Sequence, residues 1–328
     1  MRIAFVVNEV ATEIDEYTTT RLVRSAVELG HEAWYLGVGD AELAGDGKLV
    51  GRARRVEAGD GSLADLLKGV QERDDERISL DDLDAVFLRN ESLVDLQERP
   101  WAGSMGMVLG QVLGARGVTV VNDPVALVRA SSKLYLEEFP ERIRPRSLVT
   151  RNPEAIATFV AEVGHSVVKP LYGAKGRNVF VVEDAGEANL AQITEAVLRD
   201  GYALVQQFVD GGEDGDARIF LLDGEILERA GAQAAFRRVP EGNDPRANIS
   251  KGGHPVPLEI GEAERGIVEA MRRKLVADGM FFVGIDVIGD KVVEINAESA
   301  GGMQAVEALY DTDVGPTVIE ALERRVRS

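Results

Sequence analysis

The stretch Phe281–Asn296, FFVGIDVIGDKVVEIN, decides the fold of this chain. Two apolar runs flank a turn signal, which predicts an antiparallel hairpin. Asp286, Glu294 and Asn296 are polar side chains inside these otherwise apolar strands, and buried carboxylates need partners. Two carboxylates and an amide oxygen on one face suit Mg²⁺ held jointly with phosphate groups. The hairpin therefore predicts a metal site, against the alternative that its carboxylates are solvated at a sheet edge.

The metal site requires a particular hairpin register. The two polar residues of the second strand are two positions apart and share one face. Asp286 joins that face only if Ile288 pairs with Val292. We therefore predict a three-residue turn at residues 289–291.

Upstream of the hairpin, a glycine-rich loop, KPLYGAKGRNV, occupies residues 169–179 between two apolar runs. Its glycines allow close backbone approach, and its cations can pair with phosphate. The loop lacks the terminal Gly-Lys-Ser/Thr of a Walker motif, and a strand is predicted to follow it. A phosphate group would therefore lie under a hairpin flap, while a plain glycine-rich hairpin is the alternative.

A basic loop between these two motifs, RRVPEGNDPRANISKGG at residues 237–253, is a candidate site for an anionic substrate. Arg218, on the strand after Gly215 and Asp216, adds a guanidinium group suited to planar carboxylate or phosphate recognition. The alternative is a solvated loop of mixed charge.

Composition limits the classes of function. The 328 residues predict about two domains or more, and the net charge of −19 argues against nucleic acid and anionic lipid as partners. The absence of cysteine excludes disulfides, thiolate metal sites and a cysteine nucleophile in this chain. The first residues show neither a signal peptide nor a spanning helix, so a cytoplasmic location is expected.

The chain changes pattern near residue 123. Before it, alternating apolar strands and helices predict a parallel, doubly wound sheet, with residues 40–82 as a surface excursion holding one helix. After it, hairpin signals predominate. The strands expected in the whole chain are 3–7, 33–36, 85–88, 119–121, 147–149, 166–169, 179–182, 203–207, 219–222, 225–227, 281–288 and 292–295, and the clearest later helices are 153–163 and 262–277.

Taken in order, these motifs resemble the ATP-grasp ligases, and specifically the prokaryotic glutathione synthetase group, over nearly the whole chain. The likeness includes NDPVALVRASSKLY at residues 122–135, where Lys133 occupies the position of the family's first ATP lysine. The resemblance implies an α/β and α+β architecture, an ATP-grasp fold preceded by a doubly wound, Rossmann-like N-terminal domain. It implies an N-terminal domain at 1–122, a lid at 123–205 and a C-terminal domain with the metal hairpin and substrate loop at 206–328.

The resemblance also implies a role for each residue at a matching position. ATP would be bound by Lys133, Lys169, Gly173, Lys175 and Gly176 at its phosphates, by Gln206, Gln207, Phe208 and Val209 at the adenine, and by Asp216 at the ribose or elsewhere on the nucleotide. Mg²⁺, or Mn²⁺ as an alternative, would be held by Asp286, Glu294 and Asn296. The reacting carboxylate and acyl phosphate would face Arg218, Arg238, Arg246 and Asn248 as catalytic residues.

The implied reaction joins a carboxylate to an amine through an acyl phosphate, most closely γ-glutamylcysteine to glycine with release of ADP and phosphate. Residues 89–95 and 297–302 depart from the family pattern, and the small loop looks closer to that of RimK-type glutamate ligases. A RimK-type or peptide-modifying ligase for another acidic acyl donor is therefore an alternative, and a non-catalytic ATP-binding protein is a third. The implied partners are a small-molecule acyl donor, an amine acceptor and further copies of the chain in a dimer or tetramer.

Overall fold

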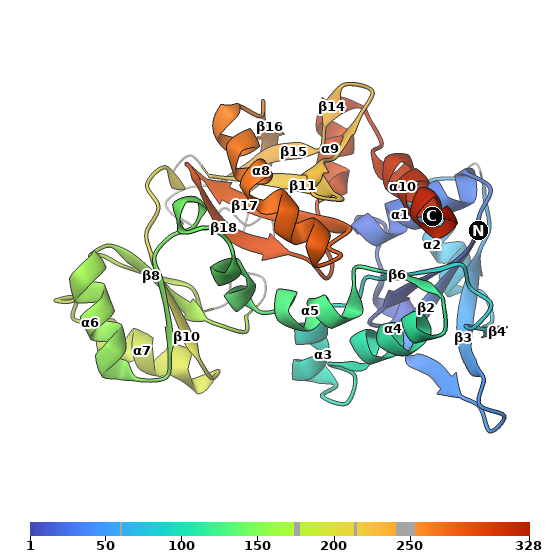
Figure 1. The fold of residues 1–328 in the computed structure, drawn as a ribbon, viewed down its shortest axis with the longest axis horizontal. Helices are drawn as coiled ribbons and strands as arrows, with labels where there is room; N and C mark the ends of the chain where they lie inside the picture. The colour runs from blue at the N-terminus through green and yellow to red at the C-terminus, as the bar shows by residue number, and fades with distance from the viewer. Residues whose placement is uncertain (60, 174–177, 213–214, 241–252) are drawn as a thin grey trace.

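The computed structural model describes residues 1–59, 61–173, 178–212, 215–240 and 253–328. Three main sheets follow one another along the chain, and we call them the N-terminal, middle and C-terminal sheets (Figure 1). Within the described ranges, no helix combines the length and the apolar character that crossing a membrane requires.

The N-terminal sheet has six strands in the order β4-β3-β2-β1-β5-β6. Parallel pairing joins β1 to β2 and β5, and β5 to β6, which confirms the predicted alternation of strands and helices. The elements of this part are β1 (Arg2–Val7), η1 (Val10–Thr12), α1 (Thr18–Glu28), β2 (Glu32–Leu43), β3 (Leu49–Val56), α2 (Leu63–Gln71), β4 (Glu76–Ser79), β5 (Ala85–Leu88), α3 (Ser92–Glu98), α4 (Met105–Ala115) and β6 (Thr119–Val121).

The prediction for residues 40–82 is wrong in its main point. The predicted helix is present as α2, but β3 and β4 flank it and extend the sheet in antiparallel fashion, so the sheet is mixed rather than wholly parallel. Strand β3 buries Ala53 and Val56 and exposes Arg52 and Arg55. Because of these arginines, the sequence of β3 does not look like a strand. The register between β2 and β3 also shifts, so the pair shows no regular alternation of apolar and polar residues.

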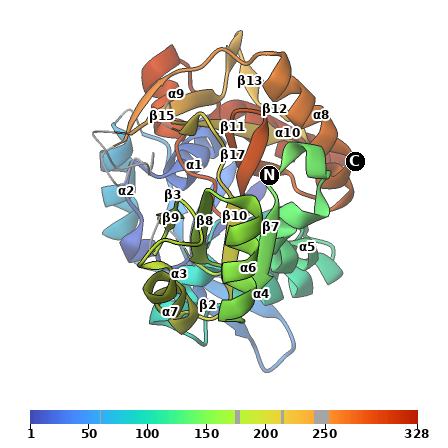
Figure 2. The same ribbon diagram turned by 90° about the vertical axis from the view of Figure 1, so that its left-hand side faces the viewer.

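The middle sheet is antiparallel throughout, in the order β7-β10-β8-β9. Its elements are β7 (Ser147–Thr150), α6 (Pro153–Val163), β8 (Ser166–Pro170), β9 (Phe180–Val182), α7 (Leu190–Arg199) and β10 (Ala203–Gln207). Helix α6 starts where predicted, because Asn152 Oδ1 accepts the Glu154 N–H at 2.9 Å and Pro153 takes the first helical position. Figure 2 looks onto this part of the molecule, with α6 and α7 toward the viewer.

The C-terminal sheet has the order β16-β15-β11-β17-β18, with β12 paired to β11. The remaining elements are α5 (Pro124–Ala130), η2 (Lys133–Glu138), η3 (Glu141–Ile143), β11 (Asp216–Leu222), β12 (Glu225–Ile226), β13 (Glu228–Arg229), β14 (Ala232–Gln233), β15 (Ala235–Val239), β16 (His254–Pro257), α8 (Glu262–Ala277), β17 (Phe282–Ile288), β18 (Lys291–Asn296), α9 (Met303–Tyr310) and α10 (Gly315–Arg327). Strand β17 lies between β11 and β18, and β18 forms one edge of this sheet.

The β17–β18 hairpin places its polar residues together by a different turn from the one predicted. Ile288 pairs with Lys291, so the turn has two residues, with Gly289 first at φ 55° as in a type II′ turn. The register then shifts, and Asp286 pairs with Glu294. The predicted three-residue turn is wrong because a bulge within β18 supplies the extra residue.

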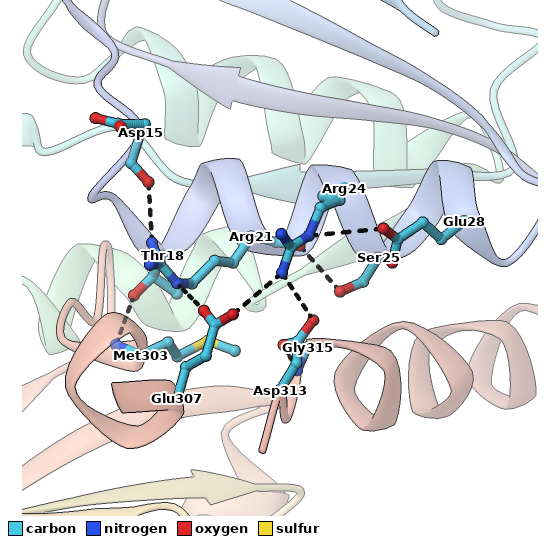
Figure 3. Close-up of polar contacts among 10 residues, drawn as sticks. All are labelled: Asp15, Thr18, Arg21, Arg24, Ser25, Glu28, Met303, Glu307, Asp313 and Gly315. Carbon is cyan, nitrogen blue, oxygen red and sulfur yellow. Dashed lines mark hydrogen bonds and ion pairs between the residues drawn. The ribbon is translucent and has the colours of Figure 1, made fainter. Parts of the chain in front are cut away.

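Ion pairs hold α1 of the N-terminal part against the C-terminal segment (Figure 3). Arg21 Nε donates to Glu307 Oε2 at 2.9 Å. Arg24 Nη2 lies 3.4 Å from both Glu307 Oε1 and Asp313 Oδ2. Helix α10 also packs beside α1. These contacts fix the N-terminal sheet relative to the C-terminal sheet.

Candidate active site

A cleft of about 1060 Å³ is lined by residues from all three parts of the molecule. It collects these predicted site residues: Lys133, Lys169, Gly173, Gln206, Gln207, Phe208, Val209, Asp216, Arg218, Arg238, Glu294 and Asn296. Asp286 does not line the cleft and is only 1% exposed. The other predicted residues, Lys175, Gly176, Arg246 and Asn248, lie outside the described residues.

Two lysines reach the cleft from different elements, Lys133 from η2 and Lys169 from β8. Lys133 Nζ donates to the Gly173 carbonyl at 2.6 Å and lies 3.6 Å from Glu294 Oε1, so it connects the glycine-rich loop to the hairpin. Burial lowers the pKa of Lys169 to about 8, although the negative charge of Glu294 acts in the opposite direction. A partly desolvated ammonium group in a cleft favours an anionic ligand such as phosphate.

Asp286 anchors two arginines beneath the cleft. Arg218 binds it through two nitrogens, with Nη2 3.0 Å from Oδ2, and Arg238 Nη2 lies 2.8 Å from the same oxygen. Burial alone would raise the pKa of Asp286, but the two guanidinium groups outweigh it and hold this pKa at about 2. Arg238 also binds Asp216, whose carboxylate accepts from Arg238 Nε at 2.8 Å. The carboxylates fix the direction of both guanidinium groups.

The donor set of the hairpin fits a hard divalent cation in chemical type and in position. Glu294 and Asn296 line the cleft, and Glu294 pairs across the strands with Asp286. The oxygens of Asp286, however, accept from both arginines, and Asn296 Nδ2 lies 3.4 Å from Asp286 Oδ2. Glu294 and Asn296 would therefore hold a metal first, and Asp286 would contribute an oxygen only by giving up one of these contacts.

The segment expected to read adenine follows β10 into the cleft. The backbone N–H groups of Gln207 and Phe208 donate to the carbonyls of Arg146 and His165, at 2.8 and 2.9 Å. The Phe208 ring also stacks on His165, with centroids 3.8 Å apart. The N–H groups of Gln207 and Phe208 are therefore already bonded within the protein, and Val209 also lines the cleft.

The opposite end of the cleft holds residues that the sequence did not nominate. Glu13 lines the cleft but is only 8% exposed, and burial raises its pKa to about 7 although Arg89 lowers it. Glu298 accepts hydrogen bonds from Ser92, through Oγ and through the backbone N–H at 3.2 Å. Burial raises the pKa of Glu298 to about 7, and the Ser92 hydrogen bonds lower it. The departures at 89–95 and 297–302 are the signal that could have identified Ser92 and Glu298, whereas Glu13 carries none.

Two arginines stabilise this end of the cleft. Arg89 donates to the Ala300 carbonyl at 2.9 Å, and burial lowers its pKa to about 10. Arg99 donates to Asp95 Oδ1 at 2.6 Å and also pairs with Glu9. The Arg99 guanidinium lies over the ring of Trp101, 5.6 Å from its centroid.

Two family models match the chain. Residues 1–128 match the N-terminal domain of prokaryotic glutathione synthetase, and residues 132–311 match its ATP-grasp domain. The glutathione synthetase of Synechococcus elongatus is 32% identical over 335 residues, which cover 99% of each chain. That of Vibrio cholerae is 30% identical over 331 residues, covering 100% of this chain and 99% of the relative.

Solved structures share the whole fold at low sequence identity. D-cycloserine synthetase DcsG superposes with a TM-score of 0.68 at 13% identity, and the ATP-grasp ligase PsnB, complexed with a minimal precursor, with a TM-score of 0.64 at 19% identity. Each alignment covers 99% of both chains. At these identities the likeness establishes the fold alone.

Proposed function

The chain belongs to the prokaryotic glutathione synthetase family, and from this premise we propose that it joins γ-glutamylcysteine to glycine, with conversion of ATP to ADP and phosphate. Members of this family are ATP-grasp ligases that use ATP and a divalent metal ion, for which we propose Mg²⁺. The observation that supports the proposal best is the cleft itself, which gathers two lysines, two anchored arginines and a hard-oxygen donor set from distant parts of the chain.

The proposed reaction begins with phosphoryl transfer from ATP to the donor carboxylate. Lys133 and Lys169 would hold the phosphates, since they come from two different elements, η2 and β8, and both line the cleft. A bound divalent ion neutralises charge on the phosphate oxygens, and Glu294 and Asn296 would hold it. Most of the remaining rate enhancement comes from holding the carboxylate in line with the transferred group.

The amine then displaces phosphate from the acyl phosphate, and the amide forms. Arg218 and Arg238 would stabilise the negative charge on the reacting oxygens, with their guanidinium groups fixed by Asp286 and Asp216. No protein nucleophile is needed, which agrees with a chain that has no cysteine. The middle sheet contributes one wall of the cleft, and its closure over ATP would keep water from the acyl phosphate.

The proposal is tested by measuring Mg²⁺-dependent ADP release with γ-glutamylcysteine, with and without glycine, and the mass of the product. We expect ADP release that depends on glycine, together with the tripeptide mass. Lys133→Met should lower the rate at least about tenfold, since it removes one charge-assisted contact to phosphate. Lys68→Met, which changes an exposed lysine on α2 outside the cleft, is the matched control and should leave the rate unchanged.

Assays with other substrates test the alternative of a RimK-type or peptide-modifying ligase. The hydrogen bonds between Ser92 and Glu298 join the two stretches that depart from the family pattern, which favours a changed substrate site. If the protein releases no ADP with γ-glutamylcysteine and glycine but does so with another acidic donor or a peptide, the glutathione assignment is wrong. The ligase chemistry would still hold. Absence of ADP release with every pair would contradict both.

A further inference from the structure

The end of the cleft nearest the N-terminal sheet is acidic, and the proposed phosphoryl transfer does not use it. Five carboxylates that line this end, those of Glu13, Glu16, Glu91, Glu98 and Glu298, enter no ion pair with the residues that the structure describes. The other end carries the lysines and arginines assigned to phosphate and carboxylate. Arg89 and Arg99 also line the acidic end, but the carboxylates there outnumber them, so the two ends of the cleft favour groups of opposite charge.

Glu13 gives the clearest sign of a ligand at the acidic end. Its side chain is more than nine-tenths buried, yet it lines the cleft. Its Oε2 atom is buried and accepts no hydrogen bond from any described residue. A buried carboxylate without a donor is costly, and a ligand that supplies a donor and a positive charge would offset this cost.

Glu298 is held rigidly at the same end. Ser92, the first residue of α3, donates to its two oxygens through the backbone N–H and the hydroxyl group. Asn8, after β1, exchanges two hydrogen bonds with the backbone of Glu91, at 2.9 and 3.0 Å, and so fixes the start of α3. Because Glu298 follows Asn296 by two residues, the acidic end directly adjoins the donor set of the hairpin.

We propose that the acidic end binds an ammonium group of a substrate, and that Glu13 and Glu298 are the residues that select it. An ammonium group brings one positive charge and three donors, which match carboxylate oxygens, whereas a substrate carboxylate placed there would be repelled. The ammonium group belongs either to the acyl donor, as its α-ammonium, or to the acceptor, as a second amino group. The first case rests on the proposed function, since γ-glutamylcysteine carries an α-ammonium group, whereas glycine has no second amino group and the second case requires another acceptor.

The test compares substrate pairs that differ only in the ammonium group, bound to the full-length protein in the presence of Mg²⁺ and a non-hydrolysable ATP analogue. The donor pair is γ-glutamylcysteine and glutarylcysteine, and the acceptor pair is 1,3-diaminopropane and propylamine. Calorimetry should show at least tenfold tighter binding of the ammonium-bearing member in one pair, and that pair identifies which substrate supplies the group. Glu13→Gln and Glu298→Gln should each reduce this preference at least threefold and leave the affinity for the ATP analogue unchanged. Glu269→Gln, an exposed change on α8 outside the cleft, should keep the preference.

Equal binding of both members in both pairs would overturn the inference, and so would a preference that both cleft variants retain. The outcome separates from that of the proposed function. Glutathione formation without any ammonium preference refutes the ammonium site alone. A preference that Glu13→Gln and Glu298→Gln abolish, in a protein that releases no ADP with any donor and amine, refutes the proposed function alone.

Discussion

Glu13 carries its carboxyl group into the wall of the cleft, where burial raises its pKa from 4.5 to about 7. The folded protein therefore binds this proton more tightly than the unfolded chain, and the stability that the neutral form provides is lost as the pH rises from 4.5 through 7. Glu13→Gln keeps the neutral shape at every pH. We expect the variant to match the wild type at pH 4.5 and to exceed it at pH 8 by at most about 3 kcal/mol.

Urea unfolding of both proteins at the two pH values measures this difference. The titration of all other groups cancels in the comparison, because only residue 13 changes. A stability difference that is the same at pH 4.5 and pH 8 would show that Glu13 does not titrate between them.

Burial disfavours the charged form of Lys169 as well, and it lowers the pKa of this lysine to about 8. A bound phosphate supplies the charge that favours its protonated form. Lys169→Met should therefore weaken ATP binding about 10- to 100-fold at pH 7, the effect of losing one hydrogen bond between charged groups. The difference in ATP affinity between the wild type and Lys169→Met should decrease above pH 8, because the wild type loses affinity there. The affinity of the variant for ATP should depend less on pH. Calorimetric titration with ATP measures both, and an unchanged affinity at pH 7 would remove Lys169 from the phosphate site.

Single residues could be predicted from the sequence where a motif carried them. Lys133, Lys169 and Glu294 stand in motifs with a recognisable order, and the structure places all three on one cleft. Glu13 could not be found this way, because nothing local in the sequence shows that the residue is buried beside Arg89, which is 76 positions away.

At the level of elements, the contact between β11 and β15 depends on a glycine. Gly215, just before β11, has φ 88°, and a Cβ atom there would lie 1.9 Å from the carbonyl oxygen of Arg238. Gly215→Ala must separate the two strands and move Arg238 away from Asp216. We expect a loss of stability of at least about 2 kcal/mol and a lower kcat.

A second glycine provides the matched control for this change. Gly266 lies on the exposed side of α8, and a Cβ atom added there would meet no atom of another element within 4 Å. Gly266→Ala should therefore stabilise the protein by about 0.5–1 kcal/mol. Thermal unfolding and steady-state kinetics of the two variants give the comparison. Equal effects from both would mean that the close approach at Gly215 does not control the strand pair.

The bounds of an element could be predicted from the sequence where its capping residues and its apolar periodicity agree. The expected helices at 153–163 and 262–277 have the observed bounds of α6 and α8, because capping and apolar periodicity agree there. The β18 bulge could not be predicted, since register is set by pairing across the sheet. The strands β15 and β16 follow from partners more distant in sequence in the same way, whereas β13 and β14 form a local two-stranded hairpin of only two residues each.

For the whole molecule, Glu307 joins α9 to α1 through Arg21 and Arg24 (Figure 3). Its carboxylate is 35% exposed and the Arg21 side chain only 11% exposed, so solvent screens the pair incompletely. Glu307→Ala should lower the stability by about 1–2 kcal/mol, more than an exposed pair provides. Glu195→Ala, which removes the exposed partner of Arg199 within α7, should cost less than about 0.5 kcal/mol.

Urea unfolding measures both changes, and following it with separate probes of the N-terminal and C-terminal parts tests the linkage. Coincident transitions in the wild type that separate in Glu307→Ala would show that this residue couples the two parts. Equal losses from Glu307→Ala and Glu195→Ala would rule out a special role for the contact. The assembly into dimers or tetramers and the cytoplasmic location stay predictions.

The stacking of Arg99 on Trp101 has an optical consequence. The chain has two tryptophans, and Trp34 is buried whereas Trp101 is 61% exposed. The emission of Trp101 should therefore respond to solvent and to the guanidinium group above it, whereas the buried Trp34 should respond less to a ligand in the cleft. Since Arg99 also holds Glu9 and Asp95 on the wall of the acidic end, a ligand that engages these carboxylates changes the quenching of Trp101. The protein thus contains its own fluorescent reporter for that end of the cleft.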